Sequence, residues 1–546
     1  MPRSVYLETF GCQMNELDSE LVSGQLRALG YAFTPDPHAA DVVLYNTCSV
    51  REHAEQKVWS RLGELKAAKE QRPGLVVGVL GCMAERDGES LMRRMPVVDV
   101  MCGPGELDKL PMLLDNAVRT RAGLLADPDI SAPQVSARQA ALQGNTSRRS
   151  ATLAAAQDTL EMLDLSRATF ASDADAGTPR KTAYVRITRG CNKFCTYCVV
   201  PFTRGAEVHR PPQHIIDECK LLADQGVIEI TLLGQTVNHY RFEHGAAVTV
   251  GGVVQPQKGR AYQGGHNRDP FAGANVTTFA DLLRRIHDEV PAIARLRFVT
   301  SYPRDFGDDV LEVIRDHPRI CRYLHVPAQS GSNRLLSLMN RGYEVGEYLE
   351  FLDRARGYLH QPELGRPLMV SGDFIVGFPT ETDADFEASM DLLRRARYKN
   401  SFIFKYSPRP GTVAIDKFED DVPEDVKRSR NNIMLAAQNQ ISDEIGREQV
   451  GREFEVFVEG LSPRARKRRA REAVALTIGG RAQAQGGPGP DESSQDVQLS
   501  ARTDGDLIVL FDAPPGVTAS SLVGRLMRVR ISGAGPLWLT GVPVTG

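Results

Sequence analysis

The sequence predicts an α/β protein with three structured parts: an N-terminal Rossmann-like domain built on a parallel sheet (1–112), a partial (β/α)6 barrel (179–446) and a small C-terminal β-barrel (447–546). Three observations support this prediction. Short apolar runs alternate with segments of helical periodicity in the first part. The same alternation recurs six times in the second part. In the last part the apolar runs are short and turn residues separate them.

In the N-terminal part, a cysteine follows each of three apolar runs. The runs are 5–7, 42–45 and 75–80, and the cysteines are Cys12, Cys48 and Cys82. Helical segments at 16–29 and 52–70 separate the runs, so the sheet is predicted to be parallel. Because the carboxyl ends of parallel strands meet at one edge, where open α/β sheets bind ligands, we expect the three thiols to converge on one site. The alternative is three ordinary buried cysteines. Cys102 ends a fourth run, and we expect it to be a core or rim thiol.

Residues 113–178 are rich in Ala, Ser, Gln and Asp and predict a low-complexity insertion or linker. One short helix near 152–165 fits the pattern. The segment carries no motif, so we expect a solvated spacer.

The barrel is predicted from six β-α steps. Strands are expected at 184–188, 228–233, 296–300, 323–326, 370–376 and 402–406. Helices are expected at 213–225, 279–288, 308–316, 346–359 and 382–396. The chemistry of such a barrel lies at the C-terminal ends of its strands. A glycine-rich insertion at 241–275 is expected to be a mobile surface loop.

Three more cysteines, Cys191, Cys195 and Cys198, lie in one loop after the first barrel strand. Their C-x3-C-x2-C spacing directs three thiolates to one centre and leaves its fourth position open. Structural zinc usually takes four protein ligands, and none follows at finger spacing. A [4Fe–4S] cluster on three cysteines keeps one iron free for a small molecule. We therefore expect a cluster here, the alternative being a zinc knuckle with a remote fourth ligand.

The last part combines short strands with a basic run. The strands are expected at 454–459, 497–502, 507–511, 525–531 and 537–540. The basic residues are Arg464, Arg466, Lys467, Arg468, Arg469 and Arg471. Such a run is often only a solvated face, but on a small barrel it also fits contact with a phosphate backbone.

Composition limits the function classes. The net charge is −3 and the pI about 6.4, which argues against nucleic-acid binding by bulk charge alone. Nine cysteines, an odd number, in a long chain without a secretory signal argue against a disulfide framework. No run approaches the ~20 apolar residues of a membrane span. We expect a soluble, cytoplasmic protein without a membrane partner.

Taken together, these motifs resemble the methylthiotransferase branch of the radical S-adenosylmethionine (SAM) enzymes. The loop Cys191–Cys198 is similar to the radical SAM signature, and Cys12, Cys48 and Cys82 match the cysteines of that family's N-terminal domain. The segments 200–205, 231–235, 325–332 and 373–381 match its barrel motifs. The terminal barrel resembles a TRAM domain, which binds tRNA.

The resemblance implies two [4Fe–4S] clusters and SAM as cofactors. Cys191, Cys195 and Cys198 would hold the radical SAM cluster, and Cys12, Cys48 and Cys82 an auxiliary cluster that holds the sulfur. Rim residues expected to contact SAM or substrate are Gln329, Ser330 and Asp373. Phe194 and Tyr197 are expected to shield the cluster. No catalytic acid or base is assigned, and the histidines show no ligand spacing.

The segments 11–15 and 46–51 are most similar to family members that add a methylthio group to C2 of N6-isopentenyladenosine at position 37 of tRNA. The implied partners of a monomeric enzyme are the tRNA anticodon loop, an external electron donor and an unidentified sulfur donor. Threonylcarbamoyl-adenosine or a ribosomal-protein aspartate are alternative substrates, and a non-catalytic iron–sulfur RNA-binding protein is a third possibility. Two residues depart from the family pattern: Arg189 stands where Glu is common, and His209 where Ser is expected. Both departures are expected to affect contacts with the substrate.

Overall fold

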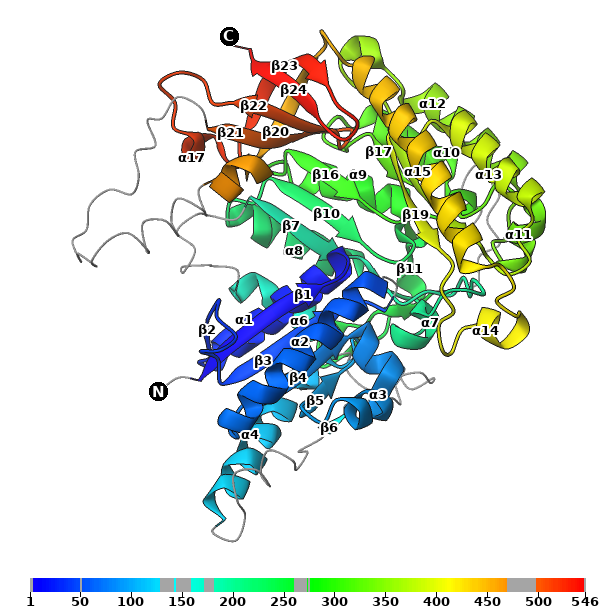
Figure 1. The fold of residues 1–546 in the computed structure, drawn as a ribbon. Helices are drawn as coiled ribbons and strands as arrows, with labels where there is room; N and C mark the ends of the chain where they lie inside the picture. Colours follow the sequence, from blue (N-terminus) through cyan, green and yellow to red (C-terminus); the bar gives the residue numbers. More distant parts are fainter. Residues whose placement is uncertain are drawn as a thin grey trace.

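A computed structural model describes residues 3–49, 52–127, 142–143, 159–170, 181–259, 273, 275–468 and 497–544. Its three parts follow one another along the chain, from the N-terminal sheet through the central barrel to the terminal barrel (Figure 1). Among the helices within these ranges, none has both the length and the apolar character needed to cross a membrane.

The N-terminal sheet is parallel, as predicted, and its strand order is β2-β1-β3-β4-β5-β6. Its strands are β1 (Ser4–Phe10), β2 (Ala32–Phe33), β3 (Val42–Thr47), β4 (Val76–Gly81), β5 (Val100–Cys102) and β6 (Leu142–Gln143). Its helices are α1 (Gln13–Ala28), α2 (Glu52–Gln71), α3 (Cys82–Arg94), α4 (Leu110–Ala126) and α6 (Thr159–Phe170). Apolar residues of α1, α4 and α6 form one core and those of α2 and α3 form another, on the other face. Because both faces are covered, β3 and β4 are buried along their whole length.

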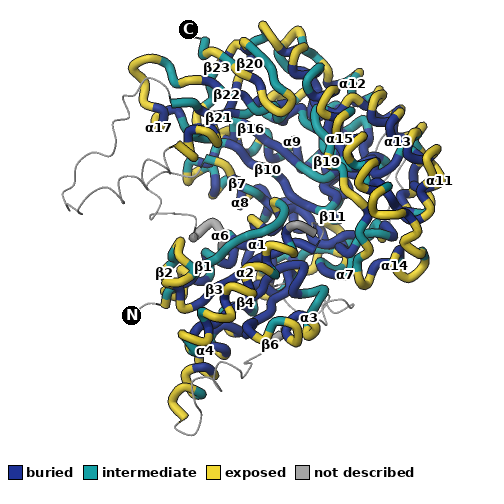
Figure 2. The backbone as a smooth tube through the Cα atoms, viewed as in Figure 1, coloured by how far each residue is buried: buried dark blue, intermediate teal, exposed yellow. Residues whose placement is uncertain are grey.

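The central barrel has six parallel strands in two three-stranded groups, β7-β10-β16 and β17-β18-β19, and a parallel bridge between Leu296 and Ile320 joins the groups. The strands are β7 (Thr182–Arg186), β10 (Glu229–Leu233), β16 (Arg295–Phe298), β17 (Tyr323–His325), β18 (Met369–Val376) and β19 (Asn400–Lys405). The predicted partial (β/α)6 barrel is therefore confirmed. Strands β10 and β16 are buried along most of their length (Figure 2).

Helices cover the outside of this barrel. They are α8 (Pro212–Asp224), α9 (Phe279–Glu289), α10 (Asp308–Asp316), α12 (Val345–Leu359), α13 (Asp383–Ala396) and α15 (Glu424–Arg447). Shorter helices are α7 (Val200–Thr203), α11 (Asn333–Leu338) and α14 (Val413–Lys417). The sequence did not predict α15, whose apolar residues are sparse. This helix packs against β19 (Figure 1).

The terminal part is a closed five-stranded barrel in the order β20-β21-β22-β24-β23, which confirms the predicted small β-barrel. Its elements are β20 (Glu453–Leu461), β21 (Gln498–Thr503), β22 (Ile508–Asp512), α17 (Ala519–Leu522), β23 (Leu526–Ala534) and β24 (Leu539–Pro543). The terminal barrel contacts the central barrel through Arg297 of β16, which donates hydrogen bonds to the backbone carbonyls of Thr503 and Asp504.

The described part of 113–178 is not a solvated spacer, so that expectation was wrong. Helix α4 runs across residue 112, and β6 adds a strand to the N-terminal sheet. The predicted short helix exists as α6, but its Leu160 and Leu163 pack into the core of the N-terminal domain. Its buried carboxylates, Glu161 and Asp164, form ion pairs with arginines of the barrel. The sequence pattern of residues 152–165 predicted a helix but did not indicate that its carboxylates pair with arginines of the barrel.

The described part of the insertion at 241–275 is also structured. Strands β11 (Arg241–Glu243) and β15 (Val276–Thr278) pair with each other, as do β12 (Thr249–Val250) and β13 (Val253–Val254). Strand β14 (Gln257–Lys258) pairs with β9 (Val208–His209), which also pairs with β8 (Thr188–Arg189). The expected mobile loop is thus, for residues 241–259, an addition to the side of the barrel that carries the loop Cys191–Cys198. Residues 260–272 lie outside the described residues.

A buried ion network joins the N-terminal domain to the barrel. Asp18 of α1 accepts hydrogen bonds from Arg186 at 3.2 Å and Arg204 at 2.8 Å. Asp164 pairs with Arg186 at 2.6 Å. Arg210 meets further carboxylates, those of Glu161 at 3.0 Å and Glu218 at 2.8 Å. Buried charges need such partners because their desolvation costs several kcal/mol each.

We expect Glu161→Ala to destabilise the contact between α6 and the barrel by about 3 kcal/mol, because it removes a carboxylate from the buried Arg210. Hydrogen exchange of α6 amides measures this loss directly. Glu89→Ala is the matched control, since Glu89 pairs with Arg93 on the solvent-exposed face of α3 and should cost less than about 0.5 kcal/mol. Equal protection of α6 in both variants would contradict the role of the network.

Candidate active site

The first cysteine site lies at the carboxyl edge of the N-terminal sheet. Cys12 is the N-cap of α1, Cys82 is the first residue of α3, and Cys48 follows the end of β3. A helix N-terminus carries partial positive charge, which favours a thiolate at Cys12. The structure thus brings the three predicted strand-end cysteines to one edge. Cys102 is fully buried, and its thiol donates to the carbonyl of Glu106 at 3.2 Å, as expected of a core thiol.

An asparagine pair supports this edge. Asn15 donates to Asn46 at 3.1 Å, and Asn46 donates to the Asn15 carbonyl at 2.9 Å. The pair leaves no room for neighbouring side chains: a Cβ on Gly81, whose φ is +87°, would lie 2.4 Å from the Asn46 oxygen. Asn15 and Asn46, the motif residues near Cys12 and Cys48, therefore hold the start of α1 against β3 and leave space only for glycine before α3.

The second site is the loop Cys191–Cys198, which follows β7 and β8 at the carboxyl edge of the barrel. Gly190, with φ of +69°, lets the loop approach the backbone of 205–206, because a Cβ there would lie 2.2 Å from the Ala206 carbonyl oxygen. Lys193 forms an ion pair with Asp305 at 2.5 Å, and Thr196 donates to the Leu338 carbonyl at 2.9 Å. The loop is thereby held from several barrel segments at once.

Beside each cysteine site lies an arginine whose side chain is almost fully enclosed. Arg341 donates to the Cys195 sulfur at 3.3 Å and to the Pro327 carbonyl at 3.0 Å. Arg204, at the end of α7, is fixed by Asp18, and α7 packs against α3, which begins at Cys82. No pattern in the sequence indicated a role for Arg341. Arg204 lies within a recognised motif but was assigned no role.

These surroundings shift the thiol pKa values in opposite directions. A hydrogen bond with Cys48 and the charge of Arg204 outweigh burial and lower the pKa of Cys12 to about 6. Burial, and then the charge of Cys195, raises the pKa of Cys198 to about 12. Burial likewise raises the pKa of Cys191. Assembly of a metal centre at the second site must therefore displace protons.

A cavity of about 640 Å³ lies between the three parts of the chain. Cys12 and Cys48 line one side, Asp373 and Phe402 belong to the barrel wall, and Trp538 comes from the terminal barrel. Asp373 has one oxygen 3.4 Å from His325, while its buried Oδ1 has no hydrogen-bond partner among the described residues. The wall of one cavity therefore contains both a carboxylate of the barrel and two thiols of the first site.

The other predicted rim residues lie elsewhere. Ser330 is buried, and its hydroxyl accepts from the Ser332 amide and pairs with Ser389, so it is already used within the fold. Gln329 has φ of +71°, and its backbone bridges to β18. Of the three residues expected to contact SAM or substrate, only Asp373 lines this cavity.

The residues expected to shield the loop differ in exposure. Phe194 is 51% exposed, with φ of +48°, whereas Tyr197 is half-buried and its hydroxyl lies 3.4 Å from Arg341. In the basic run, Arg464, Arg466, Lys467 and Arg468 are exposed just after β20. Arg469 and Arg471 lie outside the described residues.

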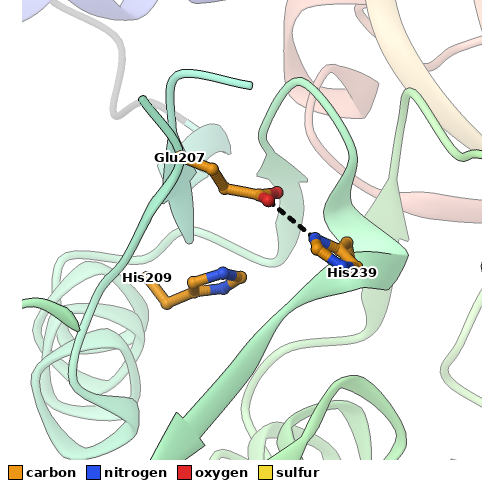
Figure 3. A group of neighbouring side chains, drawn as sticks. All are labelled: Glu207, His209 and His239. Atoms are coloured by element: carbon orange, nitrogen blue, oxygen red, sulfur yellow. Dashed lines mark hydrogen bonds and ion pairs between the residues drawn. The ribbon is translucent and has the colours of Figure 1, made fainter. Parts of the chain in front are cut away.

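Two histidines meet a carboxylate beside the second site (Figure 3). His239 lies 2.6 Å from Glu207, which also accepts from Thr236 at 3.0 Å. The Arg241 amide donates to Nδ1 of His209 at 3.2 Å, so Nε2 carries the proton. The Nδ1 lone pair of His209 is occupied by this hydrogen bond and its Nε2 carries the proton, so the ring has no free lone pair for a metal ion. The three side chains nevertheless lie close enough together to hold a metal ion. Burial lowers the pKa of His209 to about 4, so the ring is neutral.

Two expectations from the sequence concern these histidines and Arg189. Histidines that show no ligand spacing in the sequence do come together, because β9 and the segment after β10 are neighbours in space. His209 contacts the insertion rather than the cavity, since it accepts from Arg241 and a Cβ on Gly259 would lie 2.6 Å from its Nε2. Arg189 lies 3.9 Å from Glu161 of α6. Both departures thus contact insertions of this chain.

Comparison with known proteins agrees with this geometry. Residues 4–103 match the model described as Uncharacterized protein family UPF0004, and residues 185–393 match that of the Radical SAM superfamily. The tRNA-2-methylthio-N(6)-dimethylallyladenosine synthase of Rhodopirellula baltica is 40% identical over 548 residues, which cover 98% of each chain. The chain belongs to this synthase family. The synthase of Dichelobacter nodosus is 37% identical over 97% of this chain and 94% of its own.

Among solved structures, a radical S-adenosylmethionine methyltransferase from Kitasatospora setae with cobalamin and a [4Fe-4S] cluster bound has a TM-score of 0.44. It is 14% identical to this chain and covers 76% of it and 77% of its own length. The family assignment therefore rests on the similar sequences and on the family models, not on this solved structure. It confirms the resemblance that the motifs indicated, including the radical SAM barrel.

We expect the metal-free protein to react with iodoacetamide at pH 7 first at Cys12, because its pKa near 6 makes it mainly thiolate at that pH. The rate should rise between pH 5 and 7 and then level off. Cys102 is the internal control, since burial raises its pKa and encloses it. Peptide mass spectrometry gives both rates, and a Cys12 rate that rises only near pH 9 would contradict the arrangement.

Proposed function

We propose that this protein is a radical SAM methylthiotransferase that adds a methylthio group to C2 of N6-isopentenyladenosine at position 37, beside the anticodon of tRNA. The observation that carries the proposal is the 40% identity to a tRNA-2-methylthio-N(6)-dimethylallyladenosine synthase over 98% of both chains. The cavity, bounded by all three parts of the chain and lined by two thiols, suits a reaction on a large substrate.

The residues present fit two iron–sulfur clusters and SAM. Each site offers three cysteines, an odd ligand set that leaves one iron open, and each has a buried cation to balance thiolate charge. Cys191, Cys195 and Cys198 would hold the radical SAM cluster, and Cys12, Cys48 and Cys82 the auxiliary one. With SAM, these groups supply the radical chemistry that an aromatic C–H bond without acidity requires.

The chain's own residues would bind and orient the base. Asp373 lines the cavity, and its partly exposed carboxylate would accept a hydrogen bond from a ligand there. Phe402 and Phe404 of β19 are 45% and 36% exposed, stack with an interplanar angle of 14°, and line the same cavity. Exposed aromatic pairs of this kind suit unstacked bases of a single-stranded loop.

The tRNA body would be held by the terminal barrel. The exposed Arg464, Arg466, Lys467 and Arg468 suit contact with phosphates, and Arg469 and Arg471 continue the run in sequence. An external electron donor and a separate sulfur donor would complete the reaction, with the protein acting as a monomer in the cytoplasm, where its tRNA substrate is found.

Reconstituted protein, dithionite, SAM and an anticodon stem-loop carrying N6-isopentenyladenosine test the proposal. We expect the 2-methylthio product by nucleoside mass spectrometry, together with 5′-deoxyadenosine. Cys12→Ala should keep SAM cleavage and lose the product, because it removes one ligand from the auxiliary site only.

The outcomes separate the alternatives. Product only on threonylcarbamoyl-adenosine or on a ribosomal-protein aspartate would retain the chemistry and change the substrate. Absence of 5′-deoxyadenosine from the fully loaded protein would leave only a non-catalytic RNA-binding role.

We expect Phe404→Ala to weaken binding of the stem-loop by about 5- to 100-fold, since base–aromatic stacking contributes about 1–3 kcal/mol. Fluorescence anisotropy measures the dissociation constant, and Phe404→Tyr should bind like the parent. Leu364→Ala is the control, because Leu364 is 66% exposed but lies away from the cavity. An unchanged constant in Phe404→Ala would place the bases elsewhere.

A further inference from the structure

Arg341 is a buried cation without a carboxylate partner among the ion pairs of the described residues. Its side chain is enclosed by Tyr302 and Tyr343, whose ring centroids lie 4.9 Å and 5.2 Å from the guanidinium carbon. Its hydrogen bonds go to the Cys195 sulfur, to two tyrosine hydroxyls and to the Pro327 carbonyl. An unpaired buried charge is costly, so this guanidinium requires an anion, and the thiolate of Cys195 is the one within reach.

Arg204 is the arginine beside the other site, and it donates to a carboxylate rather than to a sulfur. It ends α7, which packs against α3 just beyond Cys82, and its guanidinium reaches α1 through a hydrogen bond to Asp18 at 2.8 Å. Its carboxylate partner, Asp18, is shared with Arg186, so one carboxylate faces two guanidiniums. The charges of Cys82 and Cys12 act on Arg204 together with that of Asp18.

We propose that Arg341 and Arg204 are the counter-ions of the two clusters, one for each site, and that each sets the reduction potential of its own cluster. This proposal rests on the assignment of a [4Fe–4S] cluster to each three-cysteine site. A doubly positive core held by three thiolates has a net negative charge, which increases when one electron is added. A nearby guanidinium stabilises the reduced state more than the oxidised state, and an N–H donor to sulfur adds to this effect.

The two sites provide matched controls for each other. Cys12→Ala, Cys48→Ala and Cys82→Ala combined leave only the radical SAM site, and the same changes at Cys191, Cys195 and Cys198 leave only the auxiliary site. In each background, Arg341→Met, Arg341→Lys, Arg204→Met and Arg204→Lys are reconstituted and titrated with dithionite under electron paramagnetic resonance. Iron content is measured on every sample.

We expect Arg341→Met to make the potential of the radical SAM site more negative and to leave the auxiliary site unchanged. Arg204→Met should do the reverse. The lysine variants should fall between methionine and parent, because they keep the charge but change the hydrogen-bond geometry.

The proposal is overturned if a loaded methionine variant keeps the parental potential, or if either substitution shifts both sites equally. Loss of iron from the methionine and the lysine variant alike would also overturn it, since lysine keeps the charge. Absence of a reducible cluster in the parent background would instead overturn the proposed function itself.

Discussion

The arrangement of this molecule depends on eight buried charges where the N-terminal domain meets the barrel. Four carboxylates face four guanidiniums there: Asp18, Glu161, Asp164 and Glu218, with Arg186, Arg189, Arg204 and Arg210. Desolvation makes each charge costly unless its partner is in place, so the network tolerates only one relative position of the two domains. That position places Cys12 and Cys48 in the wall of one cavity together with residues of both barrels.

The sequence predicted those parts of the site that depend on local order. Cys12, Cys48 and Cys82 follow apolar runs, and a parallel sheet necessarily brings such positions to one edge. The three cysteines of the loop Cys191–Cys198 lie within eight residues, so their spacing can be read directly from the sequence. Arg341 and the pair of His209 with His239 could not be predicted, because their partners lie far away in the chain and no periodicity marks them.

The two insertions are linked to the two departures from the family pattern. Arg189 lies near Glu161, which the first insertion contributes, and His209 accepts from Arg241, where the second begins. A glutamate at position 189 would face the buried carboxylate of Glu161, and a serine at 209 would not reach as far toward Gly259 as imidazole does. Arg189 and His209 are therefore the residues that contact the two insertions. Both insertions are polar in composition, so the sequence did not indicate that parts of them are buried in the structure.

Arg204 has a consequence for how the domains can be separated in evolution or by engineering. The cysteines of the first site belong to the N-terminal domain, but the cation beside them is encoded in the barrel, after the radical SAM loop. The N-terminal domain alone would present three thiols and an unneutralised Asp18. The site of Cys12, Cys48 and Cys82 thus combines residues of two domains, and a recombinant protein that exchanges one domain would also change the charges around these thiols.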